Sequence, residues 1–400
     1  MFGGNRMKKY TIQVCSIMIV FYTLLAFNNV VLGEELRKEE ELQLTKGAKA
    51  SLLLERDTGE ILYEQNAHEK LPPASLTKVM TLLLVMEALD EGQIKEDEII
   101  TVSERAASMG GSQVFLAAGE QMAVKDLIKA VAIASANDAS VALAERIAGS
   151  EQAFVKRMNE KVEELGLKNT KFQNSSGLPA EDHYTTAYDI AMMSKELLRY
   201  ESITDYTSIY EDYLRKGEEN EFWLVNTNRL VRFYPYVDGL KTGYTKEAKF
   251  CLAATAEKDD MRVVSVVMGA ETSKERNRMT MDLIDYAFSH YETERIYNRG
   301  ENISHYIHLQ SEKHHYKLKT SESISLLRKK GEDKLDYETE IKIDKDKPLP
   351  IEKGEQIGSI IVRTPDERIV QSPIYTDERI DLASIGTLMK RTLKMIAKYE

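Results

Sequence analysis

The chain has 400 residues, of which 42% are hydrophobic and 30% charged, a composition typical of a globular protein with two or three domains. Its formal net charge of −11 disfavours a nucleic-acid partner. The seven histidines show no metal-ligand spacing, so we expect no metal, and Cys251 lies in an apolar run where a buried, unreactive thiol is expected.

Residues 1–33 have the pattern of a signal peptide. Three basic residues precede a continuous apolar run from about Ile12 to Leu32, and the small residue Gly33 follows. The run is also long enough to span a membrane as an uncleaved helix. The small residue and the acidic flank favour cleavage, so we expect an exported chain. Its charge would be about −14, which is −11 less the three Lys/Arg of the segment.

The next part of the chain alternates between strand-like and helical patterns. Two strands are expected in 50–65, around the turn 57–60, and a second hairpin in 249–270. The pattern predicts helices at 74–89, 124–148 (interrupted near residue 135), 151–165, 186–200 and 276–290, the first almost wholly apolar and therefore central. Strands at both ends with helices between them predict an α/β (α+β) fold, an antiparallel sheet covered by helices.

The texture of the sequence changes near residue 298. Residues 298–378 contain β-branched and alternating runs between Gly, Pro and Asp, which predict a small β-rich domain. Residues 379–400 read as an amphipathic helix, with Leu382, Ile385, Met389 and Leu393 among its apolar residues and Lys390, Arg391, Lys394 and Lys398 on the opposite arc. A cationic amphipathic helix suits an anionic membrane surface. The alternative is a helix packed on its own domain.

Ser75 and Lys78 raise the first question of chemistry. They lie three residues apart at the start of the apolar helix, so Lys78 is expected on the same face as the hydroxyl. A serine is a weak nucleophile without a base, and a lysine becomes a base only when burial or a positive neighbour lowers its pKa. Taken alone, the pair is equally consistent with a helix cap and a solvent-exposed lysine.

Two further polar signals follow in a fixed order. Ser135-Ala136-Asn137 interrupts a helical stretch of small residues, and Lys241-Thr242-Gly243 precedes the final hairpin. A lysine and a threonine on a strand edge offer a cation and a hydroxyl to a carboxylate, and glycine permits close backbone approach. Each signal alone has a structural explanation, but all three in this order in one exported chain are poorly explained by structure alone.

The order S-x-x-K, S-x-N, K-T-G resembles the penicillin-binding proteins and serine β-lactamases. The wider segments narrow the resemblance to the low-molecular-mass D-alanyl-D-alanine carboxypeptidases of peptidase family S11, and within them to sporulation-associated members: Pro73–Lys78, Ala107–Ser112, Asn169-Thr170 with Gly177-Leu178-Pro179, and Val237–Tyr244. The likeness covers nearly the whole chain. It implies a β-lactamase/transpeptidase-like fold with a five-stranded sheet, a catalytic domain over 34–297, and an enzyme at the outer face of the cell membrane.

The resemblance also implies a role for each site residue. Lys78 would accept the proton of Ser75, Ser135 would pass it to the leaving D-Ala, and Asn137 would hold the substrate amide. Lys241 and Thr242 would bind the terminal carboxylate, with Lys241 also keeping Lys78 neutral, while the Ser75 and Tyr244 amides would form the oxyanion hole beside Gly243. Arg276 would add a second positive group, or serve a structural role on its helix. No cofactor is implied.

The implied activity is removal of the terminal D-Ala from peptidoglycan pentapeptide stems, which limits cross-linking in cell-wall or spore-cortex synthesis. β-Lactams would trap Ser75 covalently. A class A β-lactamase would also carry a Glu-x-x-Leu-Asn segment after S-x-N, and the sequence has none. An endopeptidase or transpeptidase of the same family, and a non-catalytic wall-binding scaffold, remain as alternatives.

Overall fold

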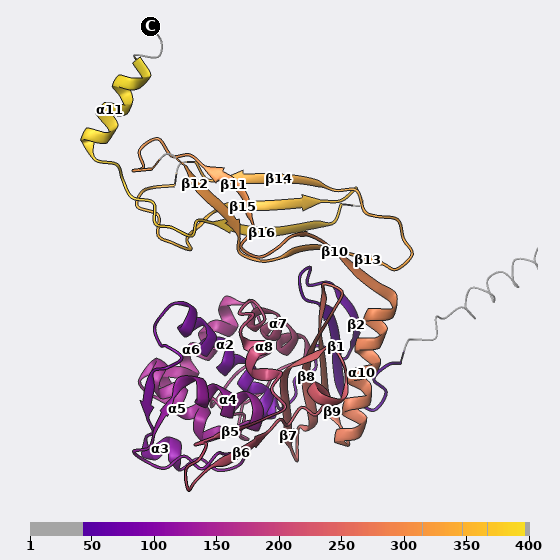
Figure 1. Cartoon of the computed structure of the whole chain (residues 1–400). Helices are drawn as coiled ribbons and strands as arrows, with labels where there is room; N and C mark the ends of the chain where they lie inside the picture. The colour runs from indigo at the N-terminus through magenta and orange to yellow at the C-terminus, as the bar shows by residue number, and fades with distance from the viewer. Residues whose placement is uncertain (1–42, 314, 346, 366, 397–400) are drawn as a thin grey trace, which may run out of the picture. The chain divides into compact units, whose positions relative to one another are not determined.

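The computed structural model describes residues 43–313, 315–345, 347–365 and 367–396 (Figure 1). An N-terminal domain and a β-rich domain follow one another along the chain, each with its own hydrophobic core. The predicted signal segment, residues 1–33, lies outside the described residues. Within the described residues, no helix combines the length and the apolar character that crossing a membrane requires.

A five-stranded antiparallel sheet lies at the centre of the N-terminal domain, in the strand order β2-β1-β9-β8-β7. Both predicted hairpins are present, and β1 pairs with β9 so that the first and last hairpins share one sheet. Every residue of β9 is buried, as expected for a Val-rich central strand with both faces covered. The strands are β1 (Ala50–Glu55), β2 (Ile61–Gln65), β7 (Val237–Thr245), β8 (Lys249–Lys258) and β9 (Met261–Ala270).

Helices cover both faces of this sheet (Figure 1). On one face α10 packs against β8 and β9, and on the other α7 packs against β1 and β9. This arrangement confirms the predicted α+β fold. The helices are η1 (Ala74–Thr77), α2 (Lys78–Asp90), α3 (Glu104–Ala107), α4 (Val124–Ala134), α5 (Asn137–Ala148), α6 (Glu151–Glu164), α7 (Ala187–Leu197), α8 (Ile203–Thr207), α9 (Leu230–Phe233) and α10 (Ser273–His290).

Helix α2 is the central helix that the sequence predicts. Its apolar residues are buried on all sides, because α4, α5, α6 and α7 surround it. The predicted single helix from residue 74 begins instead as the 3-10 turn η1, and the α-helix proper starts at Lys78. Two hairpins were not predicted, β3 (Ile99–Thr101) with β4 (Gln121–Ala123) and β5 (Glu211–Leu214) with β6 (Phe222–Val225).

The β-rich domain contains a second five-stranded antiparallel sheet, in the order β11-β12-β16-β15-β14, and the two-stranded sheet β10-β13. Strand β10 precedes the expected domain boundary at residue 298, and it pairs with β13 of the β-rich domain. The strands are β10 (Tyr291–Tyr297), β11 (Asn302–Tyr306), β12 (Tyr316–Thr320), β13 (Ile324–Lys329), β14 (Glu338–Ile343), β15 (Gln356–Arg363) and β16 (Ile369–Tyr375).

The C-terminal helix begins later than the sequence predicts. Helix α11 spans Ile385–Ile396, so Leu382, an expected member of its apolar face, precedes it. The reason lies in the core, because Ile380 is fully buried and its backbone pairs with that of Ile351. Arg391 was predicted on the free polar arc, but its guanidinium donates to backbone carbonyls of the β-rich domain, including that of Ser311 at 2.6 Å.

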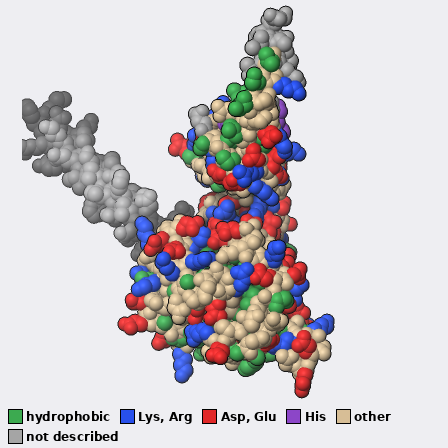
Figure 2. Space-filling view, turned by 90° about the vertical axis from the view of Figure 1, so that its left-hand side faces the viewer, with side chains coloured by type: hydrophobic (Ala, Val, Ile, Leu, Met, Phe, Trp, Pro, Cys, Tyr) green, Lys and Arg blue, Asp and Glu red, His purple; other side chains and the backbone are tan. Residues whose placement is uncertain are grey.

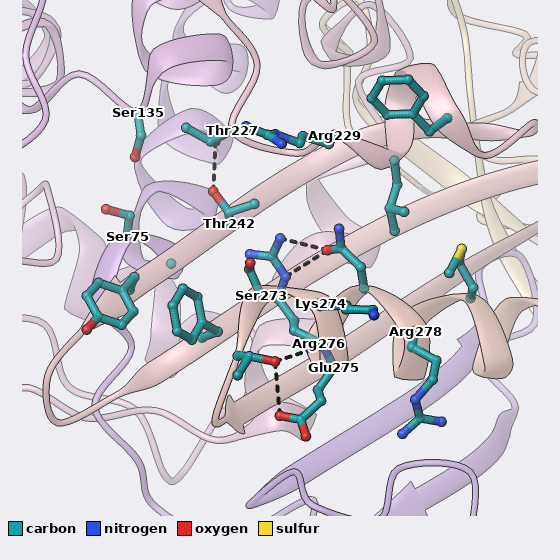
Figure 3. Close-up of a pocket in the computed structure, with 18 of the residues that line it drawn as sticks. Ser75, Ser135, Thr227, Arg229, Thr242, Ser273, Lys274, Glu275, Arg276 and Arg278 are labelled. Carbon is teal, nitrogen blue, oxygen red and sulfur yellow. Dashed lines mark hydrogen bonds between the residues drawn. The ribbon is translucent and has the colours of Figure 1, made fainter.

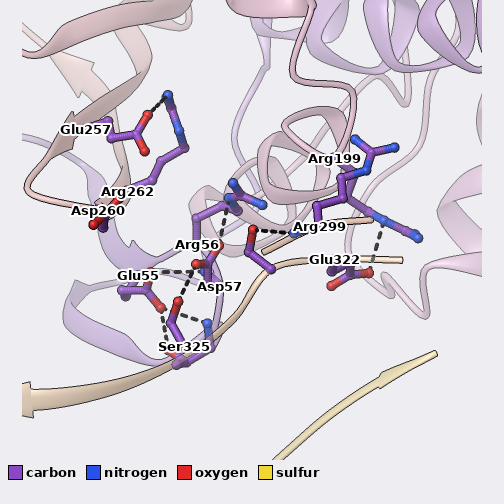
Figure 4. A network of polar contacts seen from close by, with 12 residues as sticks. Glu55, Arg56, Asp57, Arg199, Glu257, Asp260, Arg262, Arg299, Glu322 and Ser325 are labelled. Atoms are coloured by element: carbon purple, nitrogen blue, oxygen red, sulfur yellow. Dashed lines mark hydrogen bonds and ion pairs between the residues drawn. The ribbon is translucent and has the colours of Figure 1, made fainter. Parts of the chain in front are cut away.

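A buried polar network lies where the turn after β1 meets β13 (Figure 4). Ser325 donates a hydrogen bond of 2.7 Å to Asp57, whose carboxylate also lies 3.7 Å from the guanidinium of Arg295. Beside it, the carboxylate of Glu55 accepts hydrogen bonds from the backbone of Asp57 and from both the backbone and the hydroxyl of Thr58. Two buried carboxylates therefore share this junction.

We expect Glu55→Gln to change the stability of the protein in a pH-dependent way. Burial, followed by the neighbouring Asp57 carboxylate, raises the pKa of Glu55 to about 7. A raised folded-state pKa contributes stability below pH 4.5 that is lost as pH rises through about 7. Both Glu55 oxygens accept hydrogen bonds and a glutamine Nε2 cannot, so the variant also carries a cost that does not depend on pH. Its free energy of unfolding relative to wild type should therefore rise by about 1–3 kcal/mol between pH 4 and pH 8, as measured by urea denaturation. The same difference from wild type at both pH values, or an equal pH dependence in the exposed control Glu60→Gln, would contradict this explanation.

Candidate active site

A groove of about 1150 Å³ contains six of the nine predicted site residues. Figure 3 shows Ser75 and Ser135 at one side of this groove, with Thr242 facing them across it and Arg276 further along. The six residues that line the groove are Ser75, Ser135, Thr242, Gly243, Tyr244 and Arg276. The other three, Lys78, Asn137 and Lys241, lie behind its wall and are 0%, 3% and 1% exposed.

Ser75 and Lys78 face one another as the helical spacing predicts. Ser75 lies in η1 and Lys78 is the first residue of α2, which places Lys78 Nζ 3.2 Å from Ser75 Oγ. The same amine lies 2.7 Å from Asn137 Oδ1 and 2.6 Å from the backbone carbonyl of Ser176. All three partners are neutral oxygen atoms, so the amine is held in position without a carboxylate in direct contact.

The surroundings of Lys78 favour its uncharged form. Burial lowers the pKa of Lys78 well below 10.5, and the positive charge of Lys241 lowers it further. Asp138 acts in the opposite direction, but its carboxylate accepts hydrogen bonds from the amides of Val114 and Leu116. A neutral amine at 3.2 Å is placed to accept the proton of Ser75.

The predicted helix break positions the second motif. Ser135 follows α4 in the left-handed region, with φ 61°, and α5 begins two residues later at Asn137. Asn137 is fixed on both sides of its amide, because Nδ2 donates to the carbonyl of Gly110 at 2.7 Å while Oδ1 faces Lys78. Ser135 Oγ is buried and makes no hydrogen bond within the described part of the chain. A strained backbone and a hydroxyl without a partner at one groove wall are typical of a functional residue.

The third motif lies on β7, at the edge of the central sheet. Lys241 is buried, with its amine 3.1 Å from the carbonyl of Thr242. Burial, followed by the charge of Arg276, lowers the pKa of Lys241 to about 7. The hydroxyl of Thr242 lines the groove and donates a hydrogen bond of 2.7 Å to Thr227 Oγ1. Lys241 is thus buried beside the site, while the Thr242 hydroxyl lines the groove.

Two glycines allow the pieces of the site to meet. A Cβ on Gly243 would lie 3.2 Å from the backbone nitrogens of Ser75 and Leu76, so glycine lets β7 approach the turn that carries the serine. Gly177 is tighter, because its Cβ would lie 1.8 Å from the carbonyl oxygen of Ala74 and its φ is +88°. The segment that supplies the Ser176 carbonyl to Lys78 thus packs directly against the residue before Ser75.

Arg276 lies in the first turns of α10 and contributes positive charge to the groove. It is 5% exposed, and burial lowers its pKa to about 10, so it stays charged at neutral pH. Its guanidinium donates to Asn277 Oδ1 at 2.7 Å and to the Cys251 carbonyl at 3.3 Å. Arg229, Lys274 and Arg278 line the same groove (Figure 3). A ligand with a carboxylate next to the Thr242 hydroxyl matches this charge.

Sequence reasoning missed several parts of the site. The Ser176 carbonyl is a backbone group, and no side-chain pattern reveals it. Thr227 lies between Asn226 and Asn228, whose side chains both bond to backbone and fix this segment. The three consecutive polar residues Asn226-Thr227-Asn228 were the only sequence signal for this part of the site. Gly177 stood within a motif that was recognised, but its steric role became apparent only in the structure.

Family models match both domains. Residues 37–272 match "D-alanyl-D-alanine carboxypeptidase" and residues 291–381 match "Penicillin-binding protein 5, C-terminal domain". The chain is 49% identical to D-alanyl-D-alanine carboxypeptidase DacF of Bacillus subtilis over 388 residues, which is 97% of this chain and 100% of that protein. It is 34% identical to D-alanyl-D-alanine carboxypeptidase DacC of Escherichia coli, over 84% of each chain.

Solved structures resemble the chain as well. Penicillin-binding protein 5 of Haemophilus influenzae aligns with a TM-score of 0.64 and 31% identity, over 84% of this chain and 98% of that one. Penicillin-binding protein D2 of Listeria monocytogenes, solved in its ampicillin-bound form, aligns with a TM-score of 0.55 and 33% identity, over 60% of this chain and 98% of that one. The fold is thus shared with proteins named as penicillin-binding, one of which was solved with ampicillin bound.

Proposed function

The chain belongs to the D-alanyl-D-alanine carboxypeptidase family of serine peptidases, and from this premise we propose that Ser75 removes the terminal D-Ala of peptidoglycan stem peptides through an acyl-enzyme. The observation that carries the proposal is the 3.2 Å contact between Ser75 Oγ and a buried lysine amine whose direct partners are all neutral oxygen atoms. Such an amine supplies the base that a serine hydroxyl needs at neutral pH.

Acylation follows from this geometry. Lys78 accepts the proton of Ser75 as Oγ forms a bond to the carbonyl carbon of the penultimate D-Ala. The developing oxyanion faces the backbone amides of Ser75 and Tyr244, and a donor of this kind contributes about 2.7–4 kcal/mol to transition-state stabilisation. The amide C–N bond then breaks. The nitrogen of the departing D-Ala takes a proton from Ser135 Oγ, which recovers one from Lys78. In the second half-reaction water attacks the ester carbonyl while Lys78 accepts a proton from it. The bond from the carbonyl carbon to Ser75 Oγ then breaks, and Oγ recovers that proton from Lys78.

Substrate recognition divides between the two walls of the groove. Asn137 acts from behind the wall, where it holds Lys78 and the Gly110 carbonyl, while Thr242 and Arg276 bind the terminal carboxylate. Lys241 is only 1% exposed, so we expect it to support carboxylate binding through its charge and its effect on Lys78. β-Lactams carry a carboxylate next to a reactive amide, and we propose that they acylate Ser75 in the same pose.

Arg276→Gln should weaken recognition of the free carboxylate. One charge-assisted hydrogen bond is worth about 1.5–3 kcal/mol, so kcat/KM for a peptide ending in D-Ala-D-Ala should fall by about 10–100-fold. The same peptide ending in a carboxamide should react equally slowly with both proteins. Arg278→Gln is the matched control, because Arg278 lines the groove but its side chain is 54% exposed and pairs with Asp282. An equal loss for both peptides would mean that Arg276 is structural.

The proposed reaction is tested by its products. Wild-type protein incubated with a pentapeptide stem should release free D-Ala, and Ser75→Ala should release none. A protein that binds peptidoglycan without releasing D-Ala would be the wall-binding scaffold considered above. Repeating the reaction with an acceptor amine separates hydrolysis from transpeptidation, since a transpeptidase would join the donor to the amine instead of to water. We expect hydrolysis to dominate.

We also propose that the exported protein binds the outer face of the cell membrane through α11. The support is a stripe of exposed apolar residues on this helix and the absence of acidic residues from 384–399, which hold four Lys/Arg. A chain ending at Ser384 retains the buried Ile380 and Ala383. It should no longer sediment with anionic vesicles, while its D-Ala release should be unchanged. Continued sedimentation would identify the N-terminal segment as the anchor.

A further inference from the structure

Exposed apolar side chains gather on two segments, helix α11 and residues 307–309 of the β-rich domain. On α11, Ile385, Met389 and Leu393 are 78%, 62% and 64% exposed, and their spacing of four residues places them on one face. About 80 residues earlier, Ile307 and Leu309 are 56% and 69% exposed. Figure 2 shows hydrophobic side chains gathered towards the top of the view, at the height of α11 and of the β-rich domain just below it.

We call the segment that carries Ile307 and Leu309 the ledge (residues 307–309). The residues that follow it, 310–312, pair with residues 381–383, which lead into α11. Beyond the ledge, Ser311 forms a β-bridge with Leu382. The Ala383 amide donates to the Gln310 carbonyl at 2.7 Å, and the Glu312 amide to the Asp381 carbonyl at 2.9 Å. The residues before α11 are therefore fixed to those after the ledge by backbone pairing.

Arg391 extends this connection into the helix itself. Its guanidinium donates to the carbonyls of Ser311 at 2.6 Å, of Leu309 at 3.4 Å and of Glu312. One planar, charged group thus holds three carbonyls, one at the end of the ledge and two just beyond it. The helix is docked on the β-rich domain, and its exposed stripe has a set position relative to the ledge.

We propose that the ledge and the apolar stripe of α11 form one composite surface that enters the interface of an anionic phospholipid bilayer. Charge complementarity supports an anionic bilayer, because residues 384–399 contain four Lys/Arg and no Asp/Glu although the net charge of the chain is −11. A cavity of about 650 Å³ beside the ledge is lined by Ile307 and Leu309 together with Lys345, while Lys347 in the same lining is paired with Glu355. Cations next to exposed apolar groups match a headgroup region above acyl chains. This inference rests on the proposed membrane binding of α11.

The test compares variants in sedimentation with vesicles of 70% phosphatidylcholine and 30% phosphatidylglycerol. The double variant Ile307→Ser/Leu309→Ser should bind at least 10-fold more weakly than wild type, with unchanged D-Ala release. The control Ile99→Ser/Ile369→Ser removes two residues that are 57% and 55% exposed and should bind as wild type. Arg391→Lys keeps the charge but not the fork that holds three carbonyls, so it should also bind more weakly.

A direct readout does not depend on affinity. Leu309→Cys labelled with an environment-sensitive fluorophore should shift to the blue on vesicle binding and be quenched by brominated acyl chains, with labelled wild type as background because Cys251 is buried. If the ledge variant binds as wild type and the label is not quenched, while the chain ending at Ser384 does not bind, α11 acts alone and the inference is refuted with the anchor intact. If the truncated chain binds as wild type, the anchor proposal itself fails. Altered self-association without altered vesicle binding would assign the ledge to a second copy of the chain.

Discussion

Lys78→Met should reduce the rate at which benzylpenicillin acylates Ser75 by about 10²–10⁴-fold, the range expected for loss of a general base. Methionine fills the same volume but has no nitrogen to accept the proton. The amine also satisfies the Ser176 carbonyl and Asn137 Oδ1, and leaving such a buried group without a partner costs about 1–3 kcal/mol. The variant also avoids the free-energy cost of burying the lysine amine, and this offsets part of that loss. Thermal denaturation therefore separates a folded, inactive variant from an unfolded one, and stopped-flow acylation measures the effect.

The pH dependence of the wild-type reaction tests the same step. Burial and the charge of Lys241 lower the pKa of Lys78 well below 10.5. The amine therefore stays uncharged at pH values somewhat below 10.5, and it is protonated only when pH falls through the lowered pKa. Protonation removes the base, so the acylation rate should drop on the acid side of a single transition that lies well below pH 10.5. A wild-type rate that is independent of pH, or a Lys78→Met variant that acylates nearly as fast as wild type, would exclude Lys78 as the base.

Gly177→Ala should disrupt the site through the backbone. A Cβ at this position would lie 1.8 Å from the Ala74 carbonyl oxygen, and the φ of +88° is unfavourable for any residue with a side chain. Overpacking costs about 1–3 kcal/mol and the left-handed conformation about 1–2 kcal/mol, so the free energy of unfolding should fall by roughly 2–5 kcal/mol. The displaced Ala74 carries Ser75 with it, and acylation should fall even in the molecules that remain folded.

Gly149→Ala is the matched control for this effect. Gly149 ends α5 with φ +81°, close to that of Gly177, but its Cβ would meet nothing within 4 Å. The control therefore carries the conformational cost without the collision. It should lower the melting temperature by several degrees, at about 2–4 °C for each kcal/mol, and leave acylation unchanged. Equal losses of stability and activity in the two variants would show that the contact with Ala74 is unimportant.

The fold was largely predictable because its signals are local. The hairpin 50–65 and the hairpin 249–270 each have a polar turn between apolar strands, and the almost wholly apolar stretch after Ser75 indicated a central helix. The helix break near Ser135 was visible as polar residues in a small-residue helix. For the site, the helical spacing of Ser75 and Lys78 fixed their contact before any tertiary information was needed.

Other features depend on tertiary contacts that the sequence pattern does not carry. The apolar period of 379–400 placed Ile380 in the helix, but the core of the β-rich domain takes its side chain instead. Arg391 is one of several basic residues by sequence, and only its reach to three carbonyls distinguishes it. The Lys78 amine is positioned by a carbonyl 98 residues further along the chain. Lys241 is only 1% exposed, and the Lys-Thr-Gly motif by itself does not reveal that burial.

The most direct test of the proposed chemistry is to locate the covalent bond that a β-lactam forms. Wild-type protein treated with benzylpenicillin should gain the mass of one antibiotic molecule, and peptide mapping should place that mass on the fragment that contains Ser75. Ser75→Ala should gain none. An adduct on any other residue, or no adduct on correctly folded wild-type protein, would contradict the assignment of Ser75 and its neighbouring amine as the acylation centre.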